Sequence, residues 1–327
     1  MNDRTLEIKG KRNNYLLEIQ DRITIIRGDS ATGKTTMVKI ISQQLRGINN
    51  GFEINTSFYL KEVLVDNIAL PDLNYNNLYI LDEGTLEASN QFANFVNKSR
   101  SHFIIISRDR LPNVLYSFES IYEFYNDNGI TKLKRKYEEL NDQHINKLKL
   151  NKLITEDSNS GYQFYNKFRN INVITSKSNS KISKMIKDMD NIIVVFDSIA
   201  IGPYIENIYS ISRNKNIYFL YPESFEWLLL ESEIFRQKDI EDSMNYIRFL
   251  YINDKEYYTN LLAEVSSRLN IEDFKYNKHK LSPWYLEDSR FNKVINKLNE
   301  LYNLDLNKIE SDLENTSTNS KKNLIWE

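Results

Sequence analysis

A stretch near the start of the chain, residues 28–36, constrains the fold more than any other part of the sequence. It reads GDSATGKTT and contains the pattern G-x-x-x-x-G-K-[ST], with Gly28, Gly33, Lys34 and Thr35 at the fixed positions. The two glycines permit left-handed backbone, so main-chain N–H groups can approach a phosphate chain closely. The lysine supplies a positive charge for phosphate oxygens, and the threonine hydroxyl can ligate Mg²⁺. These residues therefore predict a loop that binds nucleotide phosphates.

The residues on either side of this loop support the same prediction. Residues 23–26 form a short apolar run before it, and apolar residues recur at helical spacing from Met37 to Leu45 after it. Strand, glycine loop and helix, in that order, is the context that a P-loop requires. The expected cofactors are ATP and Mg²⁺. The residues expected around the phosphates are Gly28, Asp29, Ser30, Ala31, Thr32, Gly33, Lys34, Thr35 and Thr36.

Length and composition restrict the class of protein. At 327 residues the chain can form two domains, and its 41% hydrophobic and 27% charged residues are ordinary for a globular protein. The formal net charge of -2 means that no overall field attracts nucleic acid or an anionic membrane. The absence of cysteine excludes disulfides, thiolate zinc sites and cysteine nucleophiles. We expect a cytoplasmic protein in which nothing crosses a membrane.

A second motif lies at residues 78–83, where an apolar run ends in two carboxylates, Asp82 and Glu83. At the end of a buried strand, Asp82 could hold Mg²⁺ through water, and Glu83 could orient or deprotonate the attacking water. This pair favours hydrolysis over phosphate transfer to a second substrate. The structural alternative is a strand that simply ends at solvent.

Three further features resemble ABC-type and AAA-type ATPases. Residues 6–19 alternate apolar and polar side chains around a polar turn, which predicts a hairpin, and residues 103–106 form an apolar strand after the second motif. In these families a polar residue after that strand senses the γ-phosphate, so the resemblance implies this role for Ser107 or Arg108. The alternative is that Arg108 is an ordinary solvated side chain at the end of a strand. The chain lacks an LSGGQ-like signature and room for an ABC helical subdomain, which disfavours a transporter.

Another hairpin is predicted at residues 121–133, because Asn128-Gly129 is a strong turn signal. We expect it to close the first domain, with a possible strand at residues 52–58 and a linker at residues 141–150. A basic segment runs from Lys132 to Lys152. It is either a solvated surface or a contact for a phosphate backbone.

A second α/β region follows the linker. Apolar runs at residues 153–155, 172–175, 192–196 and 217–220 alternate with helical patterns, which predicts a parallel sheet. Glu156 follows the first run and Asp197 follows the third. This arrangement resembles the Toprim domain of topoisomerases, primases and OLD-family nucleases, and the resemblance implies that both carboxylates bind Mg²⁺ beside a phosphodiester. The second aspartate of the family's D-x-D would fall at Ile199, which weakens such a site.

Other carboxylates could compensate for that loss: Asp157, Glu223 or Glu226. The structural alternative is that Glu156 and Asp197 are only the polar ends of buried strands. From residue 243 onward the pattern is helical. The tail at residues 307–326 is polar, so we expect it to fray unless its last apolar residues dock.

The expected fold class is α/β: a P-loop NTPase sheet with antiparallel hairpins at residues 1–140, a Toprim-like domain at 150–240, and a helical region at 241–327. The order resembles reduced OLD-family ATPase-nucleases, which implies a role in phage defence or in mobile-element conflict. As a hypothesis, ATP hydrolysis controls a second domain that acts on or binds DNA or RNA, with Lys34, Glu83, Glu156 and Asp197 as the catalytic residues. The alternatives are an ATP-dependent sensor whose Toprim-like domain is inactive and a small-molecule kinase. A partner protein and a homo-oligomer are both compatible with the sequence.

Overall fold

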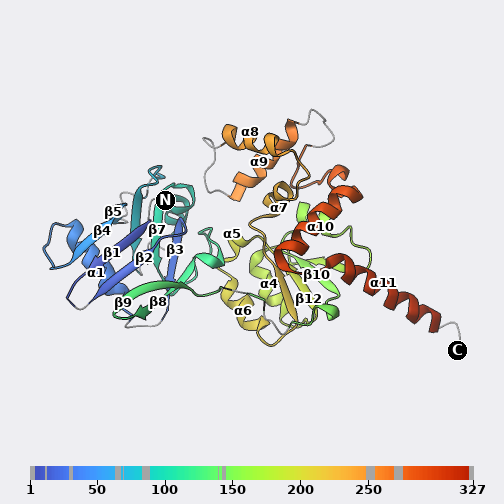
Figure 1. Ribbon diagram of the computed structural model, residues 1–327, viewed down its shortest axis with the longest axis horizontal. Helices are drawn as coiled ribbons and strands as arrows, with labels where there is room; N and C mark the ends of the chain where they lie inside the picture. Colours follow the sequence, from blue (N-terminus) through green and yellow to red (C-terminus); the bar gives the residue numbers. More distant parts are fainter. Residues whose placement is uncertain are drawn as a thin grey trace. The chain divides into compact units, whose positions relative to one another are not determined.

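The computed structural model describes residues 4–11, 13–28, 32–62, 68, 70–82, 89–138, 140–141, 145–247, 255–268 and 275–323 (Figure 1). They form two compact units, the first ending at Glu138 and the second containing the rest of the described chain. Both units combine sheets with helices, so the expected α/β class is confirmed. No helix within the described ranges is both long enough and apolar enough to cross a membrane.

The described part of the first unit is built on one nine-stranded mixed sheet. Its spatial order is β4 (Glu53–Thr56), β1 (Thr5–Lys9), β2 (Asn14–Glu18), β9 (Ile130–Arg135), β8 (Ile121–Asp127), β3 (Ile23–Arg27), β7 (His102–Ile106), β6 (Asn77–Leu81) and β5 (Tyr59–Glu62). The strands from β8 to β5 run parallel, whereas β4, β1 and β2 pair antiparallel, as do β8 and β9.

Burial explains why the two parts of this sheet have different sequences. Every residue of β3, β6 and β7 is buried, which matches their continuous apolar runs. In β1 and β2 buried residues alternate with partly exposed ones, because only one face of this part is covered. Both predicted hairpins are confirmed, and at the second turn Asn128 and Gly129 have φ of 52° and 86°.

Two helices of the first unit flank these strands in the sequence. Helix α1 (Lys34–Leu45) follows the loop after β3, and its buried side chains include Met37 and Ile41. Helix α2 (Asn90–Lys98) begins after Ser89, whose hydroxyl accepts a hydrogen bond from the Phe92 N–H at 3.0 Å. The side chains of α1 join those of β1 and β2 in one hydrophobic cluster.

Two further sequence expectations concern the first unit. The possible strand at residues 52–58 is confirmed as β4, whereas β5, at the opposite end of the sheet order, was not predicted. In the basic segment, Lys132, Arg135 and Lys136 form ion pairs with acidic neighbours on the same surface. These pairs favour a solvated surface over a phosphate contact at that position.

The second unit contains a four-stranded sheet, and the predicted parallel pairing is confirmed. Its order is β11 (Asn172–Thr175), β10 (Lys152–Thr155), β12 (Ile192–Val195) and β13 (Ile217–Leu220). The helices between and after the strands are α3 (Ser160–Tyr165), α4 (Asn179–Ile186), α5 (Ser198–Ile201), α6 (Ile205–Ser212) and α7 (Phe225–Glu231). The later helices are α8 (Gln237–Ile247), α9 (Lys255–Ser267), α10 (Asp288–Tyr302) and α11 (Leu306–Asn323).

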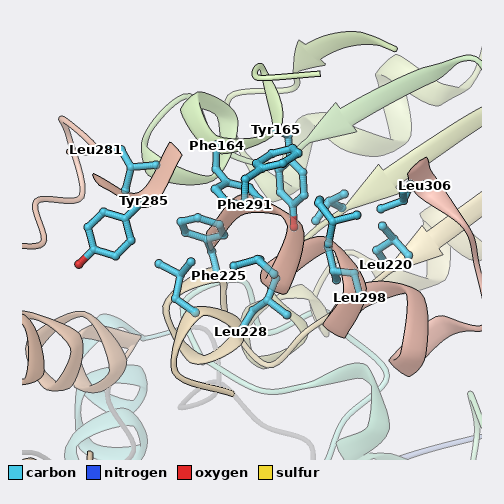
Figure 2. Close-up of a cluster of buried hydrophobic side chains, with 14 of the residues drawn as sticks. Phe164, Tyr165, Leu220, Phe225, Leu228, Leu281, Tyr285, Phe291, Leu298 and Leu306 are labelled. Carbon is cyan, nitrogen blue, oxygen red and sulfur yellow. The ribbon is translucent and has the colours of Figure 1, made fainter. Parts of the chain in front are cut away.

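The later helices share a core with the sheet. Figure 2 shows Phe164 of α3, Phe225 of α7 and Phe291 of α10 in one cluster. The ring centroid of Phe164 is 5.4 Å from that of Phe225 and 4.8 Å from that of Phe291. Helix α11 contributes Leu306 and Ile309, which are buried in the same cluster. The polar tail is helical through Asn323, and Leu306 and Ile309 anchor the start of this helix. The last apolar residues, 324–326, lie outside the described residues.

Candidate functional site

The loop between β3 and α1 has the backbone conformation that its glycines allow. Gly28 and Gly33 have φ of 125° and 90°, values that L side chains rarely adopt. The Lys34 side chain folds back onto residues of the loop. Its Nζ atom donates to the Gly28 carbonyl at 2.9 Å and to Thr32 Oγ1 at 2.8 Å. The ammonium group is therefore held among oxygen atoms at the start of the helix.

The first turn of α1 offers donors and a hydroxyl on its open side. Thr35 and Thr36 are exposed, whereas Lys34 is 7% exposed. The first N–H groups of a helix have no partner within the helix, and the helix dipole favours an anion there. No acidic side chain lies in this first turn. Asp29, Ser30 and Ala31 lie outside the described residues.

Asp82 lies at the same edge of the sheet as this loop. Strand β7 pairs in parallel with β3 on one side and with β6 on the other, so all three strands end at one edge. The register joins Ile26 to Ile106 and Leu81 to Ile105, which places the loop and Asp82 two strands apart. Asp82 is half-buried. Glu83 lies outside the described residues.

The two residues after β7 differ in their surroundings. Ser107 is 1% exposed, and its hydroxyl accepts from the Asp109 N–H and donates to the Asp109 carbonyl, each at 3.2 Å. Arg108 is exposed at the same edge.

Sequence reasoning missed two side chains beside the loop. The Tyr15 hydroxyl in β2 donates to the Gly33 carbonyl at 3.0 Å. Arg27, the last residue of β3, is 5% exposed and donates to the Tyr116 hydroxyl at 3.2 Å. Neither residue belongs to a motif, and only the folded sheet brings Tyr15 to the loop.

A second candidate site lies at the carboxyl edge of the parallel sheet in the second unit. Glu156 and Asp157 directly follow β10, and Asp197 follows β12, its neighbour in the sheet. They line a cavity of about 30 Å³, enough for one or two water molecules. The lining residues are Thr155, Glu156, Asp157, Ser160, Gly161, Tyr165, Val195, Phe196, Asp197, Phe225, Glu226 and Lys278.

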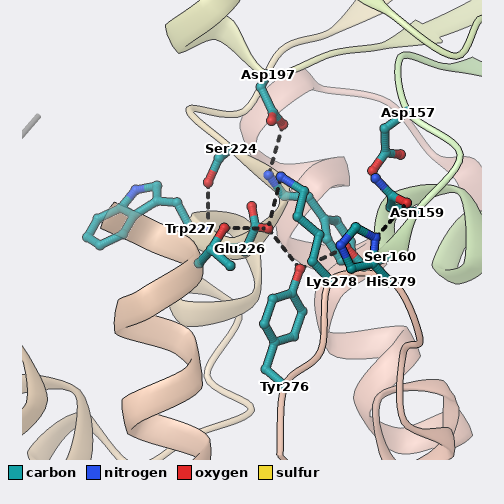
Figure 3. A network of polar contacts seen from close by, with 12 residues as sticks. Asp157, Asn159, Ser160, Asp197, Ser224, Glu226, Trp227, Tyr276, Lys278 and His279 are labelled. Carbon is teal, nitrogen blue, oxygen red and sulfur yellow. Dashed lines mark hydrogen bonds and ion pairs between the residues drawn. The ribbon is translucent and has the colours of Figure 1, made fainter. Parts of the chain in front are cut away.

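A polar network encloses this pocket (Figure 3). Its centre is Glu226, which is 3% exposed and accepts from the Tyr276 hydroxyl at 2.8 Å and from Thr259 Oγ1 at 3.1 Å. The Tyr276 hydroxyl also lies 2.7 Å from Ser160 Oγ. Lys278 Nζ is 3.8 Å from Glu226 Oε1, so this lysine brings a positive charge into an acidic pocket.

Burial changes the acid strength of one pocket carboxyl. It raises the pKa of Asp157, although the Tyr162 N–H and the positive charge of Lys278 partly oppose the shift. Asp197 Oδ1 accepts a hydrogen bond from the Phe225 N–H at 3.0 Å, so it also holds the start of α7. The pocket therefore contains carboxyl groups in different environments.

The structure thus brings Glu156 and Asp197 together, as predicted. Of the residues expected to compensate for Ile199, Asp157 and Glu226 line the cavity, whereas Glu223 is exposed and accepts a hydrogen bond from Tyr258. Ile199 itself lies in α5 and has no side-chain oxygen. Sequence reasoning missed Lys278 because it lies far along the chain in an ordinary polar stretch.

The described residues at both sites offer too few oxygen donors to hold a metal ion by themselves, so water and phosphate oxygens would have to complete its coordination. Within the described ranges, no three His, Asp or Glu side chains are grouped to hold a metal ion. Mg²⁺ is commonly held by one or two carboxylates together with water and phosphate oxygens. Thr35 with Asp82, and Glu156 with Asp197, are compatible with that mode.

Comparisons of the chain with protein-family models, curated proteins and solved structures give no match.

Proposed function

We propose that the first unit binds ATP with Mg²⁺ and hydrolyses the nucleotide. The observation that carries this proposal is the shared sheet edge: the loop that begins at Gly28 follows β3, Asp82 follows β6, and these two parallel strands have only β7 between them. The loop supplies positive charge and main-chain donors, and Asp82 supplies an oxygen that can hold Mg²⁺ through water. One site would then hold both the phosphates and their cation.

Each residue of this site has a separate task. Lys34 exchanges its contacts with Gly28 and Thr32 for phosphate oxygens, and Thr35 offers its hydroxyl to the metal. When bound there, Mg²⁺ would neutralise charge on the phosphates. Glu83, assigned from the sequence alone, orients the attacking water. Arg108 is exposed at the same edge and can contact the terminal phosphate.

Titration calorimetry with ATP and Mg²⁺ tests the binding step. Lys34→Ala should abolish measurable binding, whereas Lys39→Ala should not, because Lys39 is an exposed lysine on the same helix. Glu83→Gln should retain binding and lose phosphate release. Absence of ATP binding in the unmodified protein would refute the proposal. Phosphate transfer to an added acceptor, with no release to water, would instead support a small-molecule kinase.

For the second unit, we propose a pocket that acts on or binds nucleic acid under control of the ATP cycle. Two carboxylates, Glu156 and Asp197, end adjacent parallel strands, and this edge is where open α/β sheets bind ligands. Lys278 reaches into the same pocket and reduces its repulsion of a phosphodiester. The pairing of acidic groups with one lysine supports a phosphate ligand bound together with a divalent cation.

Labelled DNA and RNA, incubated with Mn²⁺ and with or without ATP, distinguish the two forms of this proposal. Cleavage that disappears in Glu156→Ala identifies a nuclease, and ATP-dependent binding without cleavage identifies a sensor. Lys278→Ala should weaken either activity, whereas the neighbouring Lys280→Ala should not, because Lys280 is exposed and does not line the cavity. Neither binding nor cleavage in any nucleotide state would reject the assignment.

A further inference from the structure

Tyr15 of β2 contacts the phosphate loop from a different part of the sheet. Its side chain is 3% exposed, and its ring lies 6.0 Å from the ring of Phe124 in β8. The hydroxyl donates to the carbonyl oxygen of Gly33 at 3.0 Å. Burial raises the pKa of Tyr15, so the hydroxyl keeps its proton and remains a donor at neutral pH.

The Gly33 carbonyl is also the first acceptor of helix α1. It receives the Met37 N–H at 3.0 Å, the first hydrogen bond of the helix. Gly33 is the N-cap residue and has no side chain with which to fix the helix start. Tyr15 therefore supplies, from another strand, a second hydrogen bond to this carbonyl oxygen. It does not replace an N-cap side chain, which would accept from a first-turn N–H.

Peptide geometry connects this contact to phosphate binding. A trans peptide is planar, and its C=O and N–H point in opposite directions. The carbonyl of Gly33 and the N–H of Lys34 belong to one such peptide. The Gly33 carbonyl oxygen accepts from the Met37 N–H and from the Tyr15 hydroxyl, so the Lys34 N–H points the opposite way, toward the N-terminal end of the helix. This N–H is one of the first-turn donors with no acceptor in the helix.

We propose that Tyr15 is a positioning residue for the phosphate loop: its hydroxyl fixes the Gly33–Lys34 peptide so that the Lys34 N–H faces the bound phosphate. The inference rests on the proposed ATP site and adds a residue outside its motifs. The Tyr15 hydroxyl also lies close to Gly33: a Cβ atom added at Gly33 would be 3.0 Å from the hydroxyl oxygen.

A comparison of two tyrosine variants tests this role. Tyr15→Phe removes only the hydroxyl, and Tyr79→Phe is the matched control. Tyr79 is also a buried tyrosine of the first unit, but its hydroxyl donates to Asp72 at 2.7 Å instead of to the loop. The affinities of ATP with Mg²⁺ and of inorganic tripolyphosphate are measured by calorimetry, and thermal unfolding is recorded for each variant.

Tyr15→Phe should weaken both ligands by the same factor, roughly two- to tenfold, because one hydrogen bond is lost at the phosphate end. Tyr79→Phe should lower the unfolding temperature and leave both affinities unchanged. If Tyr15→Phe lowers only the unfolding temperature, or weakens ATP but not tripolyphosphate, the positioning role is rejected. If the unmodified protein binds neither ligand, the proposed ATP site itself fails, which is a separate result.

Discussion

Replacement of Gly33 by alanine should destabilise the first unit for two separable reasons. The backbone at Gly33 has φ of 90°, and an L-residue in left-handed conformation costs about 1–2 kcal/mol. The added Cβ would also lie 3.0 Å from the Tyr15 hydroxyl oxygen, closer than an ordinary contact. Displacement of that hydroxyl removes a hydrogen bond, worth about 1 kcal/mol.

Gly129→Ala provides the matched control for the backbone cost. Gly129 has φ of 86°, nearly the same as Gly33, but an added Cβ there meets no atom within 4 Å. Replacing glycine by alanine also lowers the conformational entropy of the unfolded chain, which stabilises both variants by the same amount. The difference between them therefore isolates the contact with Tyr15, at about 1 kcal/mol, or about 3 °C in unfolding temperature for a unit of this size.

Calorimetric unfolding of Gly33→Ala, Gly129→Ala and the double variant with Tyr15→Phe measures this difference. In the Tyr15→Phe background the nearest remaining atoms lie 3.7 Å from the added Cβ, so Gly33→Ala should then cost no more than Gly129→Ala. Equal losses for the two single variants would refute the reasoning, because the contact with Tyr15 would then contribute nothing.

Three further predictions concern the core and the titratable groups. Phe291→Ala should destabilise the second unit by about 3–5 kcal/mol in denaturant unfolding, because the ring packs against Phe164 and Phe168 in the core; a loss below 1 kcal/mol would contradict this packing. Burial and the nearby charge of Arg4 lower the pKa of His102 to about 4 from 6.5. As pH falls from 6.5 to about 4, the unfolded chain therefore binds a proton at His102 before the folded chain does, and the first unit should lose stability. An unchanged pH profile of stability in His102→Gln would oppose this account. Burial raises the pKa of Asp157, so its ionisation opposes folding at neutral pH, and Asp157→Asn should raise the unfolding temperature at pH 7 but not below about pH 3.8; a lower unfolding temperature at pH 7 would count against it.

Local elements of this fold are largely readable from the sequence. The fully buried parallel strands β3, β6, β7, β12 and β13 are largely apolar runs, and Asn128-Gly129 marks a turn whose positive φ values suit these residues. The carboxylates Glu156 and Asp197 could be brought together by reasoning because parallel strands end at one edge. These successes depend on short-range patterns and on one rule of sheet geometry.

The misses concern contacts between distant parts of the chain. Nothing in the sequence indicates that Tyr15 reaches Gly33 or that Lys278 reaches Glu226, because such contacts have no period and no turn signal. The short strand β5 was missed because its residues alternate between exposed and half-buried. The sequence did not indicate that Leu306 and Ile309 anchor the start of α11, because polar residues outnumber apolar ones in this helix.

The shared core of the second unit has a consequence for synthesis of the protein. Side chains from Leu150 to Ile309 meet in one cluster, so the parallel sheet is covered on this side only when helices from the end of the chain have been made. During translation the apolar face of β10 and β13 therefore stays exposed until α10 and α11 have been synthesised, and exposed apolar surface of this kind promotes aggregation. A ribosome-bound chain that lacks these helices should therefore recruit chaperones, and shortened versions of the gene should yield insoluble product.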